Sequence, residues 1–282
     1  MRRLRDGTSF IIAYVRHDSD MRSSFRIFVS SACVIVALAS PLTGCATSSS
    51  APVEALRVEV VSTHEFDPTA FTQGLELVGD KLLVSTGLEG SSRVYYRAMS
   101  GQESHAQELD ADYFGEGVTH SGNAVWQLTW RHGTALKRDP NTLSEVGRAS
   151  YSGEGWGLCS FDDRLVMSDG TSQLREIDPE NFVELHRIQV TRDGEPVDKL
   201  NELECVDGLV YANRFMTNEI VRIDVATGNV TGTIDASGLD SGAAPDRNNV
   251  LNGIAHIPGT DRFYITGKRW PTLFEVRFVP AR

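Results

Sequence analysis

Acidic and amide side chains recur along this chain at intervals that a repeated structural unit would produce. They lie in short segments, called anchors below, that are spaced 43, 40, 46 and 50 residues apart when aligned on Gly74, Gly117, Gly157, Leu203 and Gly253. The polar side chains in the anchors are Gln73, Glu76, Glu116, Asn201, Glu202, Glu204 and Asn252. A carboxyl group can act first as a general base and then as a general acid, so the anchors are the candidate site of chemistry.

Two tryptophans, Trp130 and Trp156, lie in or near the anchors. If the anchors converge on one axis, the sequence predicts a small polar pocket with aromatic walls. Each residue taken alone has a simpler, structural interpretation. Glu and Asn at strand starts often hydrogen-bond to backbone groups, and Trp side chains usually pack against neighbouring apolar residues. The functional interpretation therefore depends on the recurrence at one phase of the repeat.

Several other chemistries find no support in the sequence. It contains no HExxH, CxxC or GxSxG motif, and its histidines lack metal-ligand spacing. The formal net charge is −11, with 27 Lys and Arg against 38 Asp and Glu. Such a balance argues against an extended phosphate-binding surface, so we expect no nucleic-acid partner.

The elements that would position the anchors are short β-strands. After the N-terminal segment, no stretch sustains a helical period, and apolar runs punctuated by Gly, Asp and Asn follow the anchors at 81–87, 124–130, 164–170, 209–215 and 262–268. A period of 40 to 50 residues with several strands per unit is typical of a β-propeller, whereas a β-sandwich would show no such period. Five units predict an all-β, five-bladed propeller.

The ends of the chain indicate how the ring closes. The last unit, 251–279, is one strand short, and 57–66 at the start is a strand without a unit. Pairing the N-terminal strand into the last blade would close the ring without a free edge. The innermost strands would then bring the anchors together along a central channel.

The N-terminal segment has the pattern of an export signal. An apolar run at 27–39 follows Arg22 and Arg26 and precedes a small-residue site ending at Cys45. The run is short for a membrane-spanning helix, which needs about 20 apolar residues. Leu-Thr-Gly-Cys resembles the bacterial lipobox, so Cys45 is expected to carry lipid, although an ordinary signal peptide with a chance Cys is the alternative. The true start is either Met1 or Met21.

These patterns divide the chain into three parts. Residues 1–44 are the expected signal segment, 45–56 the lipidated Cys and a flexible tether, and 57–282 a single propeller domain. The expected location is the periplasm, with contact to a bacterial membrane through the lipid anchor only.

Two cysteines remain in the expected domain, and we expect them to form a disulfide. Cys159 and Cys205 each lie two positions after an anchor's alignment point, on the expected inner strands of neighbouring blades. Inner strands approach one another near the axis, and an exported protein meets an oxidising compartment. The alternative is a pair of buried free thiols.

Every repeat unit carries short distinctive motifs. They are FTQGLE (71–76), STGLxGSS (85–92), FGEG (114–117), QLTW (127–130), GWGL (155–158), SDGT (168–171), LNELE (200–204), YAN (211–213), LNGIA (251–255) and TGKxWP (266–271). Together they resemble the plant and bacterial glutaminyl-peptide cyclotransferases. The resemblance covers about 57–279 and implies a five-bladed propeller that converts N-terminal glutaminyl residues of peptides and proteins to pyroglutamyl residues with release of ammonia.

The resemblance also implies roles for individual residues. Glu116 would be the proton shuttle, and Gln73 and Asn201 would hold the substrate amide or amine. Lys268 would stabilise a carbonyl oxygen or the peptide backbone of the substrate. Glu202 is a reserve candidate for binding the ammonium form. The expected walls around the glutaminyl side chain are Phe71, Phe114, Trp130 and Trp156, together with Phe215, where the family often has Trp.

Two other functions stay open at this point. One is a non-catalytic binding propeller on a lipoprotein. The other is a calcium-dependent hydrolase of the lactonase type, with oxygen ligands from Glu76, Asn201, Glu204 and Asn252. For the cyclotransferase, we expect no required cofactor, leave room for a structural Ca²⁺ in the channel, and expect a monomer.

Overall fold

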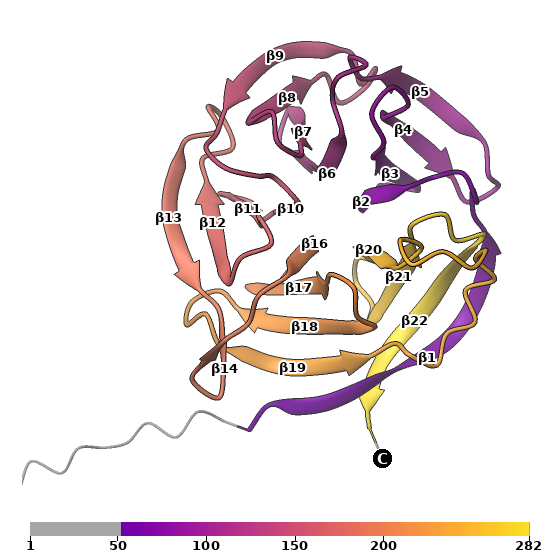
Figure 1. The fold of residues 1–282 in the computed structure, drawn as a ribbon, viewed down its shortest axis with the longest axis vertical. Coiled ribbons are helices and arrows are strands. Elements are labelled where there is room, and N and C mark those ends of the chain that lie inside the picture. Colours follow the sequence, from indigo (N-terminus) through magenta and orange to yellow (C-terminus); the bar gives the residue numbers. More distant parts are fainter. Residues whose placement is uncertain (1–51, 282) are drawn as a thin grey trace, which may run out of the picture. The chain divides into compact units, whose positions relative to one another are not determined.

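The computed structural model describes residues 52–281, and every regular element in this range is a β-strand. Three sheets are four-stranded antiparallel meanders (Figure 1). The first contains β2 (Thr72–Val78), β3 (Lys81–Thr86), β4 (Arg93–Ala98) and β5 (Glu103–Glu108). The second contains β6 (Gly115–Ser121), β7 (Ala124–Thr129), β8 (Thr134–Arg138) and β9 (Glu145–Ser150). The third contains β10 (Leu158–Ser160), β11 (Leu165–Met167), β12 (Gln173–Ile177) and β13 (Glu184–Gln189).

The fourth large sheet has eight strands in the order β16-β17-β18-β19-β1-β22-β21-β20. Its strands are β16 (Leu200–Val206), β17 (Leu209–Arg214), β18 (Glu219–Asp224), β19 (Val230–Asp235), β20 (Leu251–His256), β21 (Arg262–Gly267), β22 (Thr272–Pro280) and β1 (Glu54–Glu65). The remaining strands, β14 (Thr191–Arg192) and β15 (Glu195–Pro196), form a small ribbon. The sheets are arranged around a central axis, as in a propeller (Figure 1).

The N-terminal strand closes this arrangement. β1 pairs antiparallel with β22 from Leu56↔Pro280 to Glu65↔Thr272, so the expected pairing with the last unit is confirmed. Its first residues also pair in parallel with β19, which joins the last two groups of strands into one sheet.

The first strand starts three residues before the domain boundary expected at residue 57. β1 begins at Glu54, so residues 54–56 belong to the sheet and not to a tether. Leu56 is buried in a cluster with Ile234 and Val276, and this burial holds the start of the strand in place. The expected signal, 1–44, and Cys45 lie outside the described residues. Between residues 52 and 281, no helix is long and apolar enough to cross a membrane.

The anchors form the innermost strands, which contact one another in the ring order β2, β6, β10, β16, β20 and back to β2. Their glycines allow this close approach. A Cβ on Gly74 would lie 2.7 Å from the backbone nitrogen of Val118 on the neighbouring strand. The convergence of the anchors that the repeat predicted is therefore confirmed.

The apolar core lies between neighbouring sheets. One cluster, for example, combines Val166 and Leu174 of the third sheet with Val210 and Val221 of the fourth. Full burial of such side chains stabilises the fold by roughly 1.5–3 kcal/mol each. The outermost strands of the first three sheets are mostly polar and exposed, so the buried part of these sheets is the inner half, which positions the anchors.

Candidate active site

A cavity of about 290 Å³ lies where the inner strands begin. Its lining residues are Phe71, Gln73, Phe114, Glu116, Trp130, Trp156, Asn201, Phe215, Asn248 and Lys268. The four residues expected to be catalytic and five of the six expected to bind substrate therefore line one cavity. They come from all four large sheets or from the loops next to them.

A chain of amides orients the polar floor of the cavity. Glu116 is 4% exposed, and its Oε1 accepts a hydrogen bond from Gln73 Nε2 at 3.2 Å. Gln73 Oε1 in turn accepts from Asn252 Nδ2 at 3.0 Å, and the same Nδ2 donates to the carbonyl of Thr72. Asn252 thereby orients the side-chain amide of Gln73, so that the NH₂ group of Gln73 is directed at the carboxyl group of Glu116.

Burial shifts the pKa values of the two charged groups in opposite directions. Burial raises the pKa of Glu116 well above its ordinary value, Lys268 opposes this rise, and Glu154 adds to it. Burial lowers the pKa of Lys268 to about 8, against the opposing effect of Glu116. The pKa values of both groups are therefore moved towards neutral pH, where each group can give up or accept a proton.

Aromatic rings form the walls. Phe71 and Phe114 meet edge to face with centroids 6.1 Å apart, and Phe114 lies 5.5 Å from Trp130. On the other side, Trp156 and Phe215 meet edge to face at 5.5 Å. Lys268 Nζ lies 4.9 Å and 5.0 Å from the ring centroids of Phe71 and Phe215. The cavity thus combines an apolar enclosure with one acid, one base and three amides.

Comparison with known proteins agrees with this arrangement. A family model described as glutamine cyclotransferase matches residues 32–278. The chain belongs to the glutamine cyclotransferase family. A curated glutaminyl-peptide cyclotransferase of Arabidopsis thaliana is 36% identical over 230 residues, which cover 79% of this chain and 72% of that protein. The crystal structure of Myxococcus xanthus glutaminyl cyclase superposes with a TM-score of 0.77 at 36% identity, covering 82% of this chain and 100% of that one.

The structure places Glu202 apart from the other expected site residues. Glu202 is not among the residues that line the cavity, and its side chain accepts hydrogen bonds from the backbone of two neighbouring inner strands. Its Oε1 accepts from the N–H of Leu75 at 3.2 Å and its Oε2 from the N–H of Ile254 at 2.8 Å. Glu202 therefore ties β16 to β2 and β20, and it is not placed to bind a substrate ammonium group.

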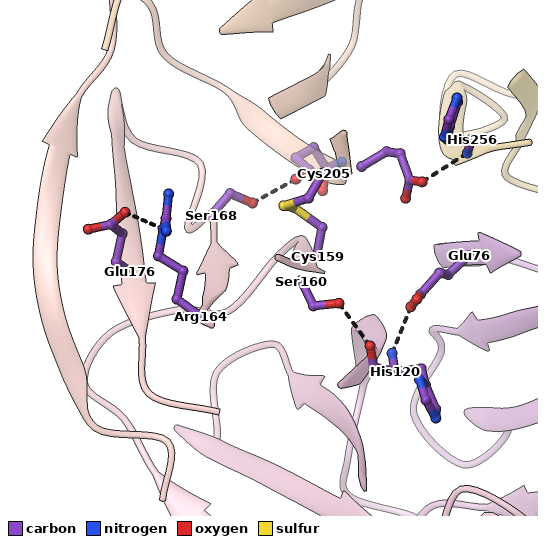
Figure 2. The surroundings of a disulfide bond; sticks show 11 residues. Glu76, His120, Cys159, Ser160, Arg164, Ser168, Glu176, Cys205 and His256 are labelled. Atoms are coloured by element: carbon purple, nitrogen blue, oxygen red, sulfur yellow. Dashed lines mark hydrogen bonds and ion pairs between the residues drawn. A yellow bond between two sulfur atoms is a disulfide. The ribbon is translucent and has the colours of Figure 1, made fainter. Parts of the chain in front are cut away.

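Two other anchor glutamates have the same structural use. Glu76 Oε2 accepts from the N–H of His120 at 2.7 Å (Figure 2), and Glu204 Oε1 accepts from the N–H of His256 at 2.9 Å. The simpler interpretation of anchor acids, as partners of backbone groups, is correct for them. Among residues 52–281, no group of three or more His, Cys, Asp or Glu is placed to hold a metal ion.

Asn248 is the lining residue that sequence reasoning missed. It lies in the loop that precedes β20, outside the repeated motifs, and is exposed at the mouth of the cavity. The only available signal was the polar run Asp-Arg-Asn-Asn directly before an anchor. Such a run is common in loops, so it carried no specific prediction.

The expected disulfide is present between Cys159 of β10 and Cys205 of β16, with a Cα separation of 5.5 Å (Figure 2). It links the inner strands of neighbouring sheets. Cys205 lies four residues beyond Asn201 on the same strand, a rise of about 13 Å. The bridge therefore supports the inner ring from outside the cavity.

Proposed function

We propose that this cavity binds an N-terminal glutaminyl residue and that Glu116 moves the proton of its cyclisation. The chain is a glutaminyl-peptide cyclotransferase, an acyltransferase that converts N-terminal glutaminyl residues of peptides and proteins to pyroglutamyl residues and releases ammonia. The observation that carries the proposal is a buried carboxyl group of raised pKa beside an amide and an ammonium group within aromatic walls.

The reaction needs a group that takes up a proton and then returns it. The α-amine must be neutral to attack the amide carbon of its own side chain. A new nitrogen–carbon bond forms, the bond to the amide nitrogen breaks, and the proton lost by the attacking nitrogen leaves on the departing ammonia. One carboxyl group can perform both transfers if its pKa lies near the working pH, and burial moves Glu116 in that direction.

The remaining polar groups have complementary tasks. Lys268 is the donor for the oxyanion that develops on the attacked amide, because a fixed cation in a dry site is effective there. Gln73 and Asn201 hold the amide or the amine of the substrate. Since ring closure is intramolecular, holding the side chain in a near-attack conformation supplies much of the rate.

The aromatic walls suit the apolar part of the glutaminyl side chain. The methylene groups of the glutaminyl side chain are enclosed by four rings that exclude water, those of Phe71, Phe114, Trp130 and Trp156. Phe215 supplies the same kind of wall as the family's Trp without an indole N–H, so any hydrogen bond from that ring to a substrate is lost here.

The reaction as written uses side chains of this chain for every step and requires no cofactor. A structural Ca²⁺ in the channel is a separate proposal with a stabilising role only. Chelation by EDTA is therefore expected to leave turnover unchanged, and activity that EDTA abolishes and Ca²⁺ restores would contradict the proposal.

The architecture and location complete the proposal. Taking β16–β19 and β20–β22 with β1 as two blades gives a five-bladed propeller, supported by the ring of five inner strands. Residues 1–44 export the protein to the periplasm, and the lipidated Cys45 anchors a monomer to a bacterial membrane.

The partners of the enzyme are peptides or proteins with N-terminal Gln.

The activity is tested with a Gln-initiated dipeptide and its N-acetylated counterpart. We expect ammonia and a pyroglutamyl product from the first and nothing from the second, because acetylation removes the attacking amine. Ammonia from both dipeptides would indicate simple amide hydrolysis. Binding without ammonia release from either would favour a non-catalytic binding propeller.

A further inference from the structure

Glu154 makes an unusual set of contacts beside the cavity. It lies in the loop between β9 and β10, and a single oxygen, Oε2, accepts hydrogen bonds from the indole nitrogens of Trp130 at 2.8 Å and Trp156 at 2.9 Å. The two tryptophans belong to different sheets, since Trp130 follows β7 and Trp156 precedes β10. One carboxylate oxygen therefore joins two walls of the cavity.

The second oxygen of Glu154 is also occupied. Its Oε1 accepts from Arg131 Nε at 2.9 Å, and the guanidinium carbon of Arg131 lies 3.7 Å from the centre of the Trp130 ring. Desolvation raises the pKa of Glu154, but the hydrogen bonds from Trp156, Arg131 and Trp130 together hold that pKa below its ordinary value. Glu154 is thus a carboxylate when it binds the indoles.

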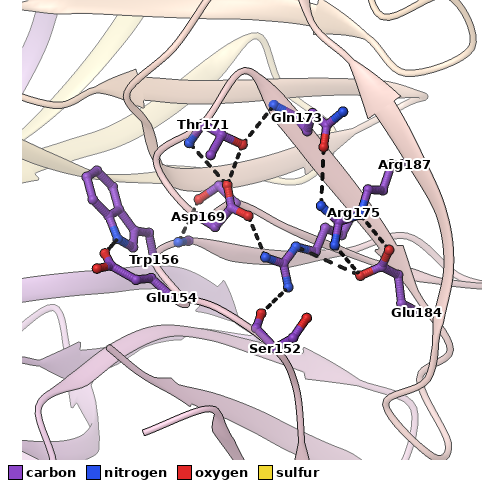
Figure 3. A network of polar contacts seen from close by, with 11 residues as sticks. Ser152, Glu154, Trp156, Asp169, Thr171, Gln173, Arg175, Glu184 and Arg187 are labelled. Atoms are coloured by element: carbon purple, nitrogen blue, oxygen red, sulfur yellow. Dashed lines mark hydrogen bonds and ion pairs between the residues drawn. The ribbon is translucent and has the colours of Figure 1, made fainter. Parts of the chain in front are cut away.

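The loop that carries Glu154 is bonded to Arg175 of the third sheet (Figure 3). Arg175, which is 4% exposed, donates to the carbonyl of Ser152 at 2.7 Å and pairs with Asp169. Gly153 has φ +80°, and a Cβ there would lie 3.2 Å from Arg175 Nη2. These contacts join the two residues that precede Glu154 to the third sheet.

We propose that Glu154 is a positioning residue that ties the two tryptophan walls to one point and so sets their spacing around the glutaminyl side chain. Its effect on substrate affinity rests on the proposed function, whereas its effect on the indoles does not. Walls that touch unreacting methylene groups contribute equally to the ground state and the transition state. Their loss is therefore expected to raise KM with little change in kcat.

The indole N–H groups provide a test that is independent of activity. The sequence contains four tryptophans, and Trp126 and Trp270 donate to the carbonyls of Pro179 and Asn249 instead. In Glu154→Gln, the proton–nitrogen correlation spectrum should show two shifted indole signals and two unchanged ones, because only Trp130 and Trp156 exchange a charged acceptor for a neutral one. Unchanged signals for all four would overturn the proposal, whatever the activity of the protein.

Kinetics of the full chain test the consequence for substrate. Glu154→Ala should raise KM for a Gln-initiated dipeptide about tenfold, the size expected for losing hydrogen bonds to a charged acceptor. Glu154→Gln should stay within about threefold of wild type, because one amide oxygen can still accept both indole N–H groups. Glu145→Ala, which removes an exposed carboxylate paired with Arg148 on the same strand, β9, is the matched control and should leave KM unchanged.

The results separate the two proposals. A wild-type KM in Glu154→Ala, or equal impairment of the Ala and Gln variants, would overturn the positioning role. If Glu154→Ala fails to fold, Trp130→Phe and Trp156→Phe replace it, since each keeps a ring and removes one N–H; an unchanged KM in both would overturn the role. Absence of cyclisation by the wild-type chain, with the expected indole shifts, would contradict the proposed function alone.

Discussion

At the scale of single residues, the cavity depends on two buried groups of opposite charge. Burial raises the pKa of Glu116 and lowers that of Lys268, and each group opposes the shift of the other. A fully exposed pair would remain ionised throughout the neutral range and would exchange protons poorly with a substrate amine. Their burial is therefore the feature that makes these two charged side chains candidates for acid–base catalysis.

This pair predicts a bell-shaped dependence of kcat on pH. The carboxylate must be free to accept a proton, so activity falls as the pH drops through the raised pKa of Glu116. Lys268 must be charged, so activity falls again as the pH rises through about 8. Lys268→Arg should lower the rate but remove the alkaline limb, because Arg does not deprotonate in proteins. An identical alkaline limb in both proteins, measured at saturating dipeptide, would contradict the assignment of Lys268.

The repeat does not distinguish every anchor side chain. Glu116 and Glu202 both lie one residue before an alignment point, so spacing alone treats them alike, and only the motif favoured Glu116. The structure shows that Glu116 lines the cavity, whereas the carboxylate of Glu202 accepts hydrogen bonds from the N–H groups of Leu75 and Ile254. Asn248 and Glu154 lie in loops whose path the repeat does not determine, and only the structure reveals their contacts.

At the scale of elements, glycines decide how closely the inner strands pack. A Cβ on Gly117 would lie 2.5 Å from the backbone nitrogen of Leu158, whereas a Cβ on Gly147 of β9 would make only an ordinary 3.8 Å contact. Gly117→Ala should therefore lower stability by about 1–3 kcal/mol, and Gly147→Ala should be neutral or slightly stabilising. Urea unfolding of both variants gives the comparison, and equal stabilities would show that the inner strands do not need the glycine.

The disulfide is the second element-scale prediction. Joining Cys159 to Cys205 closes a loop with a sequence separation of 46, which the chain-entropy model values at about 4 kcal/mol, an upper estimate. The double variant Cys159→Ala, Cys205→Ala should be less stable and retain its turnover well below the melting temperature, because the bridge lies outside the cavity. Intact mass after alkylation of the unreduced fragment from Ser48 checks the bond itself. Uptake of two alkyl groups would contradict it.

The order of the strands was predictable because each repeat unit contains the same succession of strands. The anchors, the strands that follow them and the closing of the last unit by the N-terminal strand all agree with the structure. The start of β1 was missed because residues 54–56 gain their place from pairing with β19, a distant partner. The ribbon of β14 and β15 was missed because it occurs in one unit only and has no counterpart in the repeat.

At the scale of the whole molecule, the propeller is expected to work in the periplasm while a lipid holds it to a bacterial membrane. Cys45→Ser should abolish incorporation of labelled lipid and release the protein in soluble form, because the modified thiol is lost while the rest of the signal remains. Turnover of the released protein should equal that of the wild type. A wild-type chain that takes up no labelled lipid would show that the lipobox interpretation is wrong.

The most direct test of the account is the turnover of Glu116→Gln on a Gln-initiated dipeptide. The amide fills the same volume but cannot shuttle a proton, so turnover should fall by about 10²–10⁴ with an unchanged melting temperature. Glu76→Gln is the matched control, since it alters another anchor glutamate. The carboxylate of Glu76 accepts a backbone N–H, which an amide oxygen can also do. A folded Glu116→Gln protein with near wild-type turnover would contradict the central claim that this carboxyl group moves the proton.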